Sequence, residues 1–561
     1  MNFFNNIYSY LKNNPALIII IIFALALSGY LVRLQLRLGV AYWDIFLYLN
    51  NALMYAGLGE GSITQLPPLL SFLTSLFFRL GYVKASPLYL ISGLIFASGI
   101  IGLYLLLKLR FSTTESLAGA ITFSSFTVVL SWAATGSLDV PAVCLAIWLT
   151  YILIYGFKKD QRALILVFPM AFLTFFTRYT SGLMILPLGF YFLTVILEGQ
   201  LKKDHLLKLG LGFLIGLIIL APVMGFFYSK LGTPVPFLNL LEGSVANDPA
   251  QGDPAYLPGK SYYINHFPQY ISSYPVNDSY STMLYPSLAQ TNLVAYLILI
   301  IAGAGLLIYA LRYIRCFKNF KTRGKRKKVL FLIAGIIISL LFIFTLQGNS
   351  YLPAAVAMLA LIFLIYYSTK KQAGKNSSLD MMMLIWFLTY FISHSFLIIK
   401  VDRYFITTTP ALAYLLILGF NQIQDKLSQL SKKKISAGLL AMALALLLLF
   451  SSIQPYAYNV PRHIYGDLET AGNLMEEYDP DYQDKVIYSD YWPAMSWHLK
   501  MNVKRGWPKN FEDNAQFSRM LLENNTTYFI NYYSDPPLNL TGFVEVQRVA
   551  NIIIFERMEG F

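Results

Sequence analysis

Four charged side chains stand where apolar stretches of the sequence begin or end. Asp44 follows the first apolar run, in AYWDIFLYLNN, and Asp139 opens a later one, in TGSLDVPAVC. Arg178 in FFTRYTSG and Arg403 in VDRYFITTTPAL stand at similar boundaries. A carboxylate can take the proton of an attacking hydroxyl, and the guanidinium fork of arginine matches phosphate geometry. Together these residue types suit the transfer of a group from a phosphate to a hydroxyl.

Each of these residues also has an ordinary structural interpretation. Asp44 taken alone is compatible with a solvated loop acid, and Asp139, followed two residues later by a proline, with a helix N-cap. Arg178 and Arg403 are compatible with anchors at the lipid interface. His394 fits a hydrogen-bonded interior histidine. The catalytic interpretation therefore depends on a fold that brings these side chains to one face.

The composition indicates which elements must position them. Of the 561 residues, 56% are hydrophobic and 13% are charged, whereas a soluble protein carries roughly a quarter of charged residues. Apolar runs of membrane-spanning length recur, so we expect an all-α polytopic membrane domain. The first run is interpreted as a retained helix, because no typical signal cleavage site follows it. Thirteen spans are predicted: 15–36, 88–108, 115–133, 139–157, 162–176, 178–197, 207–228, 291–311, 328–346, 350–367, 380–399, 404–420 and 435–453.

Basic residues concentrate in alternate gaps between these spans, as they do in short cytoplasmic loops. The densest cluster, RYIRCFKNFKTRGKRKK at 312–328, holds nine basic residues and no acid. The pattern predicts a cytoplasmic N-terminus. It also relates the formal charge of +14 to topology and to contact with anionic lipids, with no role for nucleic acid.

The same topology predicts three long segments outside the cytoplasm. They are the loop 37–67, the loop 229–290 and the tail 454–561. The loop 229–290 exceeds an ordinary connection, which indicates a functional or locally mobile segment. The apolar stretch 67–80 is too short to span and is predicted to be re-entrant or interfacial.

Two domains are expected: a transmembrane domain over 1–453 and a water-soluble extracytoplasmic domain over 454–561. Strand-length and helical patterns alternate in the second, which predicts a small α/β unit. Its expected elements are a strand at 485–490, a helix in WPAMSWHLK, a helix at 514–524, a strand at 526–533 and a closing hairpin of FVEVQRV and NIIIFERM.

The predicted topology places Asp44, Asp139 and Arg403 on one external face. Ionisable groups at membrane depth are costly and usually face a cavity. A lipid-linked phosphosugar, whose phosphate lies at headgroup level, would give two carboxylates and an arginine there a common ligand. The sequence has no DxD-like acid pair and no glycine-rich phosphate loop, which disfavours enzymes that use nucleotide sugars or ATP.

Four stretches, in this order, resemble the GT-C glycosyltransferases, in the branch of the protein O-mannosyltransferases and the aminoarabinose transferases of lipid A. They are YWDIFLYLNNALMYAGLGEG, the Pro-Pro segment QLPPLLSFLTSLFFRLG, GSLDVPAVCLAIWLTYIL and DRYFITTTPALAYLLILG, which contains an Arg-Tyr motif. The resemblance extends roughly over residues 10–460. The number of spans and the external C-terminal domain also fit this branch.

The resemblance implies transfer of a hexosyl or pentosyl group from a dolichyl- or undecaprenyl-type phosphate donor to a lipid, glycan or protein acceptor. Transfer inverts the anomeric carbon, requires no cofactor and tolerates a divalent metal ion. By position, Asp44 matches the base and Asp139 the second acid, and Arg403 with Tyr404 matches the contact to the lipid phosphate.

The sequence departs from some relatives at two places. Leu47 and Tyr48 stand where some have a basic residue, and Gln65 with Leu66 stands where some have Lys or His. The phosphate charge then falls mainly on Arg403.

Further contacts are predicted from these departures and from position in the predicted topology. Arg178 and Lys400 are expected to assist at the phosphate, and Tyr48 and His394 to contact substrate. Three alternatives stay open: an oligosaccharyltransferase-like enzyme, although a WWDYG-type motif is absent; a transporter or flippase of a lipid-linked saccharide, which should have inverted repeats; and a non-catalytic scaffold.

Overall fold

The computed structural model describes residues 14–236, 259–276, 283–318, 325–348, 350–370, 376–431, 438–458, 463–532 and 538–560, with the single residues 374 and 436. Contacts divide the chain into two compact units. The helical unit comprises the chain up to Tyr30, Gly93–Ala133 and Leu138–Val460, and the α/β unit comprises Leu31–Ser92, Ala134–Ser137 and Pro461–Phe561. The stretch 31–92, which the sequence assigns to the transmembrane domain, thus groups with the C-terminal region.

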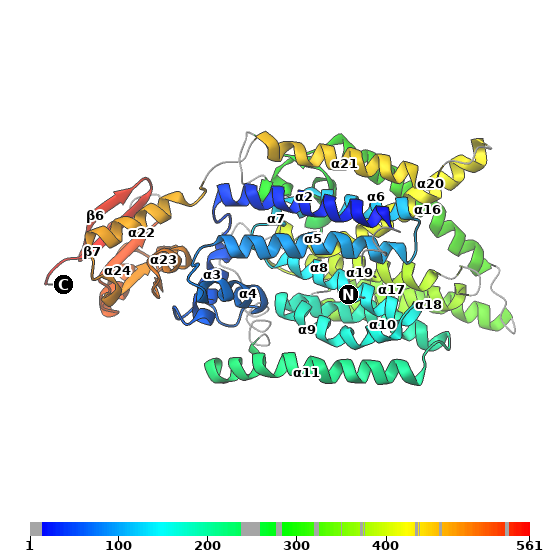
Figure 1. Ribbon diagram of the computed structural model, residues 1–561, viewed down its shortest axis with the longest axis horizontal. Helices are drawn as coiled ribbons and strands as arrows, with labels where there is room; N and C mark the ends of the chain where they lie inside the picture. Colours follow the sequence, from blue (N-terminus) through cyan, green and yellow to red (C-terminus); the bar gives the residue numbers. More distant parts are fainter. Residues whose placement is uncertain are drawn as a thin grey trace, which may run out of the picture. The chain divides into compact units, whose positions relative to one another are not determined.

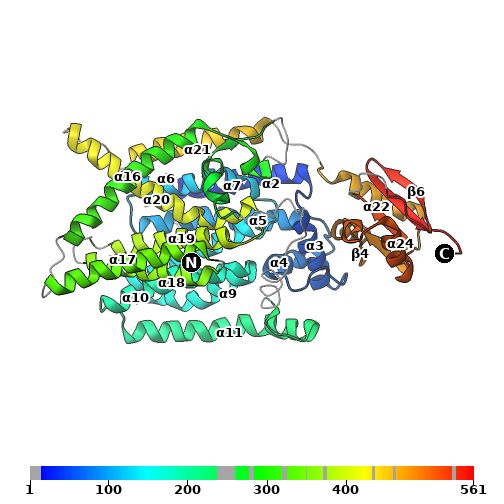
Figure 2. The ribbon, with the colours of Figure 1, turned by 180° about the vertical axis from the view of Figure 1, so that it is seen from behind.

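The described residues contain 11 helices that are long and apolar enough to cross a membrane. Figures 1 and 2 show helices of this kind, such as α11, α19 and α21, with their axes in roughly the same direction. This confirms the expected all-α polytopic architecture. The 11 are α2 (Pro15–Leu38), α5 (Ser86–Lys108), α8 (Asp139–Lys158), η2 with α10 (Tyr179–Leu197), α11 (Lys203–Leu231), α16 (Leu293–Lys318), α17 (Lys325–Gln347), α18 (Tyr351–Thr369), α19 (Ser377–Phe396), η4 with α20 (Asp402–Ser431) and α21 (Leu439–Tyr458).

Burial separates inner from outer helices of this set. The span of η4 and α20 is 89% buried, and that of α8 is 72% buried. The span of α17 has no buried residue, although it is the most apolar of all. A helix that is apolar on every side and exposed on every side is suited to lipid contact, because lipid solvates apolar side chains and the helix satisfies its own backbone.

Two of the thirteen predicted spans consist of shorter helices. The stretch 115–133 forms α6 (Thr113–Ser125) and α7 (Thr127–Trp132), and 162–176 forms η1 (Gln161–Leu166) and α9 (Val167–Thr177). The break between α6 and α7 follows two serines whose hydroxyls both donate to the Ile121 carbonyl, at 2.9 and 2.6 Å. Serine hydroxyls that bond to helix carbonyls compete with the helix pattern, and hydropathy does not register this.

Part of the predicted loop 229–290 is folded onto the helical unit, whereas 237–258 and 277–282 lie outside the described residues. Its elements are α13 (Tyr262–Asn265), α14 (Phe267–Ile271), β1 (Ser273–Tyr274) and η3 (Pro286–Leu288), and β1 pairs antiparallel with β2 (Gln290–Thr291). Two bonds fasten it to α7. Trp132 Nε1 donates to the Leu284 carbonyl at 3.0 Å, and the Ser273 amide donates to Thr127 Oγ1 at 3.1 Å.

In the α/β unit, the predicted loop 37–67 and the stretch 67–80 each contain a helix, and one of these helices contacts a C-terminal element. These helices are α3 (Trp43–Ala56) and α4 (Leu69–Arg79), which pack on each other, and α3 also contacts α23 (Trp492–Leu499). The remaining helices are α22 (Gly466–Tyr478) and α24 (Asn514–Glu523). The predicted loop 37–67 therefore contains a helix, and the stretch 67–80 forms a short helix.

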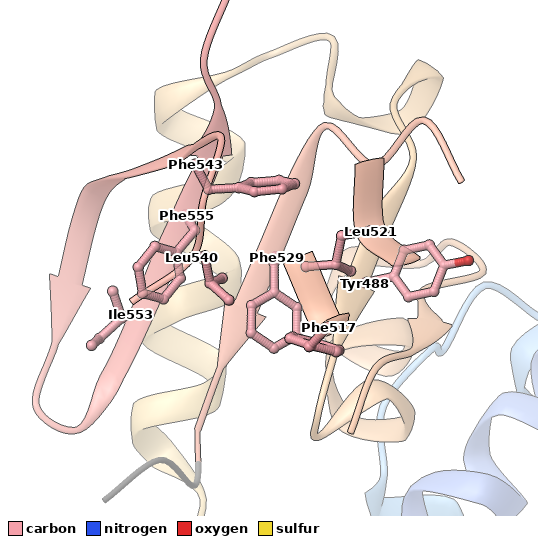
Figure 3. Packing of buried hydrophobic residues seen from close by; sticks show 8 residues of the cluster. All are labelled: Tyr488, Phe517, Leu521, Phe529, Leu540, Phe543, Ile553 and Phe555. Carbon is pink, nitrogen blue, oxygen red and sulfur yellow. The ribbon is translucent and has the colours of Figure 1, made fainter. Parts of the chain in front are cut away.

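A five-stranded mixed sheet completes the α/β unit, in the order β4-β3-β5-β7-β6. The strands β4, β3 and β5 run parallel, and β5, β7 and β6 run antiparallel. Phe529, Phe555 and Phe517 lie together in its core (Figure 3), and Phe517 with Leu521 packs α24 against the sheet. The predicted small α/β fold is confirmed, with α22 and β4 in addition. The strands are β3 (Ile487–Ser489), β4 (Lys504–Arg505), β5 (Tyr528–Asn531), β6 (Phe543–Val549) and β7 (Ile552–Arg557).

Candidate active site

Asp139 forms the centre of a buried charged cluster in the helical unit. It is the first residue of α8, and Leu138 occupies the N-cap position, so the N-cap interpretation of Asp139 is wrong. The side chain is only 2% exposed. Asp139 forms an ion pair with Arg178, and its Oδ2 lies 3.8 Å from Arg403 Nε. The structure thus brings together three of the four charged residues that the sequence singled out.

Arg178 reaches this cluster from the junction between α9 and η2. Its backbone is extended there, which ends α9 after the apolar run VFPMAFLTFFT. The Nε atom donates to Thr180 Oγ1 at 2.9 Å, and the guanidinium lies 4.9 Å from the Tyr404 ring centroid. These contacts hold the guanidinium in one orientation.

Arg403 enters the cluster from η4, which contacts α8. Its guanidinium lies 5.5 Å from the Trp132 ring centroid and 6.0 Å from that of Tyr404. Ring faces attract cations at such distances. Tyr404 is therefore near both arginines, and Trp132 is a site residue that the sequence analysis missed.

The cluster carries more positive than negative charge. Arg178 and Arg403 contribute two positive charges and Asp139 one negative charge, so the three groups sum to +1. The arginine side chains keep 12% and 10% of their surface accessible, against 2% for Asp139. The carboxylate is thus enclosed, while both arginine side chains keep a small accessible surface. Such a pair of guanidinium groups suits a phosphate.

His394 lies at the edge of this cluster and is 2% exposed. Its Nε2 lies 3.0 Å from Thr407 Oγ1, and its ring centroid lies 5.3 Å from that of Tyr404. The interpretation as a hydrogen-bonded interior histidine is confirmed. Its Nδ1 has no hydrogen-bond partner among the described residues. Contact of His394 with substrate stays a prediction.

Lys400 precedes η4 and is 3% exposed. Its Nζ donates to the Leu397 carbonyl at 2.5 Å. Burial lowers the pKa of Lys400, and the charge of Lys260 lowers it further. The ammonium is thus held by the backbone, and its role at a phosphate stays a prediction.

Asp44 and Tyr48 belong to the α/β unit. Asp44 lies in the first turn of α3, where a negative charge is favourable, and it is partly exposed, whereas Tyr48 is buried. Trp43, the residue before Asp44, packs edge-on against Tyr491 at 4.5 Å. Asp44 is therefore a helical residue beside an aromatic cluster, and the loop interpretation is wrong. Its meeting with Asp139 at one site stays a prediction.

Asp402 is a buried acid that the sequence analysis missed. It is completely buried and accepts three hydrogen bonds from the folded part of the segment 229–290. The donors are Tyr262 Oη at 2.6 Å, Tyr270 Oη at 3.0 Å and the Ser287 amide at 2.7 Å. Burial and the Asp402 carboxylate raise the pKa of Tyr262, so its phenol stays protonated and donates. The only sequence signal was an acid directly before Arg403.

A second buried carboxylate lies at the other end of α19. Asp380 accepts from Arg110 Nε at 3.1 Å and from the hydroxyls of Tyr309 and Tyr414. Asp380 and His394 are 14 positions apart on α19, which corresponds to about 21 Å along the axis. The Asp380 network therefore ties helices together away from the Asp139 cluster. Among the described residues no group of three or more His, Cys, Asp or Glu could hold a metal ion.

Comparison with known proteins identifies the fold. Residues 65–226 match the model of the family described as dolichyl-phosphate-mannose-protein mannosyltransferase. The crystal structure of ArnT from Cupriavidus metallidurans in the apo state is similar, with a TM-score of 0.54 and 12% identity over 97% of this chain and 98% of that chain. No protein of curated function matches the sequence.

Two further structures are similar at lower scores. ArnT from Cupriavidus metallidurans bound to undecaprenyl phosphate has a TM-score of 0.47 at 11% identity, over 98% of this chain and 99% of that chain. Arabinofuranosyltransferase AftD from Mycobacteria has a TM-score of 0.48 at 12% identity, over 97% of this chain and 40% of that chain. The chain therefore shares its fold with apo ArnT, and its residues 65–226 resemble the mannosyltransferase family.

Proposed function

We propose that this protein transfers a sugar from a polyprenyl phosphate to a hydroxyl of a lipid, glycan or protein acceptor, with inversion at the anomeric carbon. The observation that carries the proposal is the cluster of Arg178, Arg403 and Asp139, whose charges sum to +1 inside a membrane-spanning unit. The family model matched by residues 65–226 names a dolichyl-phosphate sugar, which is a donor of this chemical class.

In this mechanism Arg403 and Tyr404 bind the donor phosphate, and Arg178 adds a second positive charge. The acceptor oxygen attacks the anomeric carbon while the bond from that carbon to the phosphate oxygen breaks. The electron pair leaves with the phosphate, whose growing negative charge the guanidinium groups stabilise. Asp139 holds both arginines, so its contacts favour a positioning role over direct contact with the acceptor.

Asp44 accepts the proton of the acceptor hydroxyl during the attack. Asp44 lies in the first turn of α3 and is partly open to solvent, so its carboxylate is accessible to an acceptor. The reaction requires no cofactor in this proposal, and the effect of a divalent metal ion is a variable of the assay. The alternating basic clusters support a cytoplasmic N-terminus and a site that faces away from the cytoplasm.

The test uses purified full-length protein in lipid nanodiscs with a panel of polyprenyl-phosphate sugars. Each donor is offered with lipid, glycan and peptide acceptors, with and without Mg²⁺, and products are identified by mass spectrometry. Donor-dependent glycosylation supports the proposal. Movement of the lipid-linked sugar across proteoliposomes without any glycosylated product would instead identify a flippase and contradict it.

A further inference from the structure

The helix α4 of the α/β unit turns hydroxyl side chains inward and large apolar side chains outward. Phe72 and Leu76 lie on its outer side and are 44% and 41% exposed. A helix on a water-soluble unit normally buries such residues and exposes its hydroxyls. The orientation of α4 therefore indicates a medium other than water on its outer side. The buried residues of α4 are Leu70, Ser71, Thr74, Ser75 and Phe78.

The three buried hydroxyls make few hydrogen bonds. Ser75 Oγ donates to the Phe72 carbonyl within the helix, at 2.6 Å. The hydroxyls of Ser71 and Thr74 have no hydrogen-bond partner among the described residues. In water they would gain by facing outward, but an apolar medium offers them no partner there. Such a medium also removes the cost of leaving Phe72 and Leu76 uncovered by protein.

The exposed apolar side continues past the end of the helix. Leu80 directly follows α4 and is 84% exposed. Residues 72, 76 and 80 follow one another at intervals of four, so their side chains form one stripe along the helix. Phe77 beside this stripe is also exposed. We call the side chains of Phe72, Leu76, Phe77 and Leu80 the apolar stripe.

The chain enters a membrane-spanning helix shortly after the apolar stripe. α5 begins at Ser86, seven positions after Arg79, so the Cα atoms of these residues are at most about 25 Å apart. Tyr82 Oη and Ser86 Oγ form a hydrogen bond of 3.0 Å, which ties the end of the stripe to the start of α5. Residues 86–92 of α5 belong to the same unit as α4. The stripe is thus within reach of the bilayer that α5 crosses.

Basic and aromatic side chains flank the apolar stripe. Arg79, Tyr82 and Lys84 are exposed, and Lys84 Nζ lies 5.7 Å from the Tyr82 ring centroid. Tyrosine is favoured at the level of the lipid headgroups, and basic side chains attract anionic lipids. Together with the nearby start of α5, these residues favour a lipid surface over a protein partner as the medium that covers the stripe.

α4 is attached to the helix that carries the proposed base. α3 and α4 pack on each other, and Arg79 Nη2 donates to the Tyr55 carbonyl in the last turn of α3, at 2.5 Å. Tyr55 and Phe72 make an edge-to-face contact, with ring centroids 6.3 Å apart. A displacement of α4 relative to the membrane would therefore also displace α3 and Asp44.

We propose that α4 lies in the membrane surface, with its apolar stripe among the acyl chains, and that it holds α3 and Asp44 at the level of the lipid headgroups. An amphipathic helix in this position buries its apolar side at the boundary between headgroups and acyl chains. The role for Asp44 rests on the proposed function, because the phosphate of the donor lies at that level. The lipid contact of α4 does not depend on it.

The test uses nitroxide spin labels on the full-length protein in nanodiscs, after both cysteines of the chain have been replaced by alanine. The labels are attached at Phe72→Cys, Leu76→Cys and Leu80→Cys. Their collisions are measured with oxygen, which concentrates among acyl chains, and with the water-soluble nickel complex NiEDDA. We expect a ratio of oxygen to NiEDDA collisions several-fold higher than that of a label in water.

Two further labels provide the references. Ile337→Cys reports lipid, because Ile337 is exposed on the apolar span of α17, which has no buried residue. Arg519→Cys reports water, because Arg519 is an exposed residue of α24. Frequent collisions of the α4 labels with NiEDDA would show that water covers the stripe. Rare collisions with both reagents would show that protein covers it, and either result would overturn the proposal.

A transfer assay then tests the positioning of Asp44. The double variant Phe72→Glu with Leu76→Glu places two charges on the stripe and should withdraw α4 from the acyl chains. NiEDDA collisions at Leu80→Cys should then rise. We expect kcat/KM for a bilayer-embedded polyprenyl-phosphate donor to fall by about tenfold or more.

Val544→Glu is the matched control, because it introduces the same acid at an exposed apolar residue of β6 in the same unit. It should transfer as the wild type does. Unchanged NiEDDA collisions or unchanged transfer in the double variant would overturn the positioning of Asp44. Lipid contact of the α4 labels in a protein that transfers no sugar would support the surface helix and contradict the proposed transferase.

Discussion

Arg178 and Asp139 form a buried ion pair between the end of α9 and the start of α8. The sequence placed them 39 positions apart, each beside an apolar run. Arg403 lies near the same carboxylate, with its Nε atom 3.8 Å from Asp139 Oδ2. Two guanidinium groups thus share one carboxylate, an arrangement that suits an anionic ligand.

Asp139→Asn should destabilise the protein and at the same time reveal the ligand. Removing one partner of a buried charge pair costs about 3–5 kcal/mol, because the remaining charge stays buried without compensation. Arg178 and Arg403 would both lose their carboxylate. We expect a lower midpoint of thermal unfolding in nanodiscs. Added undecaprenyl phosphate should raise that midpoint more in the variant than in the wild type, because its phosphate replaces the lost negative charge.

Asp380→Asn is the control for this experiment. Asp380 is equally buried and pairs with Arg110, but at the opposite end of α19. This variant should also unfold earlier, with no extra rescue by undecaprenyl phosphate. If undecaprenyl phosphate raises the unfolding midpoint of both variants equally, or does not raise that of Asp139→Asn, the phosphate does not bind at the Asp139 cluster.

Asp44→Asn should abolish most transfer without unfolding the protein. The amide keeps the shape of the side chain but cannot take a proton from the acceptor. Losing a well-placed group of the transition state commonly costs a factor of about 100 to 1,000 in kcat. The rate of transfer from the active donor, together with thermal unfolding, measures both quantities.

Asp204→Asn matches this substitution chemically. Asp204 is an exposed acid in the first turn of α11, just as Asp44 lies in the first turn of α3. Its removal changes only a helix-end charge, so transfer should stay at the wild-type rate. Near-normal transfer by Asp44→Asn would show that another group acts as the base.

The sequence alone was sufficient to predict the convergence of Asp139 and Arg403. Alternating basic loops ordered the helices, and that order placed both residues at the same side of the membrane. The helix α3 was harder to predict, because Phe46, Leu47, Leu49 and other apolar residues occur on all its sides. Such a segment is stabilised as a helix by contacts with α4 and α23, and α23 is distant in sequence.

Asp402 could not be found from the sequence for the same physical reason. Its donors, Tyr262, Tyr270 and Ser287, lie 140, 132 and 115 positions away. No local period or spacing connects an acid to tyrosines at such separations. The pair Asp402–Arg403 was visible as two adjacent charges, but the structural partner of each charge depends on the tertiary fold.

The stability of the α/β unit should fall below neutral pH because of His498. Burial lowers the pKa of His498 to about 3, and the charge of Lys500 adds to this effect. The unfolded chain binds a proton near pH 6.5, so between pH 6.5 and 3 it binds more protons than the folded unit. Stability is therefore complete above pH 6.5 and is lost as the pH falls. From pH 7 to 5 the loss should be up to about 2 kcal/mol.

Hydrogen exchange of the α23 amides in the full-length protein measures this loss directly. His498→Gln keeps a polar side chain that does not titrate, so its α23 amides should show a weaker pH dependence. The ring of His498 packs edge-on against Phe46, and opening of α23 should also expose α3. The same pH dependence in wild type and variant would assign the effect to other groups.

Tyr262→Phe should weaken the binding of undecaprenyl phosphate, because the hydrogen bonds of Asp402 anchor η4, which carries Arg403. The substitution removes one hydroxyl donor to the Asp402 carboxylate and leaves the ring in place. A hydrogen bond to a charged group contributes about 1.5–3 kcal/mol, so η4 would be held less firmly. We expect the Kd for undecaprenyl phosphate to rise by about tenfold or more.

Tyr309→Phe is the matched control, because Tyr309 donates in the same way to Asp380 at the other end of α19. It should leave that Kd unchanged. A double-mutant cycle of Tyr262→Phe with Arg403→Lys then tests the coupling. If Tyr262 acts through Arg403, the loss of binding free energy in the double variant should differ from the sum of the two single losses by about 0.5 kcal/mol or more. Additive losses of binding free energy, or equal losses in Tyr262→Phe and Tyr309→Phe, would contradict this role. The hydrogen bonds to Asp402 would then affect only the stability of the protein.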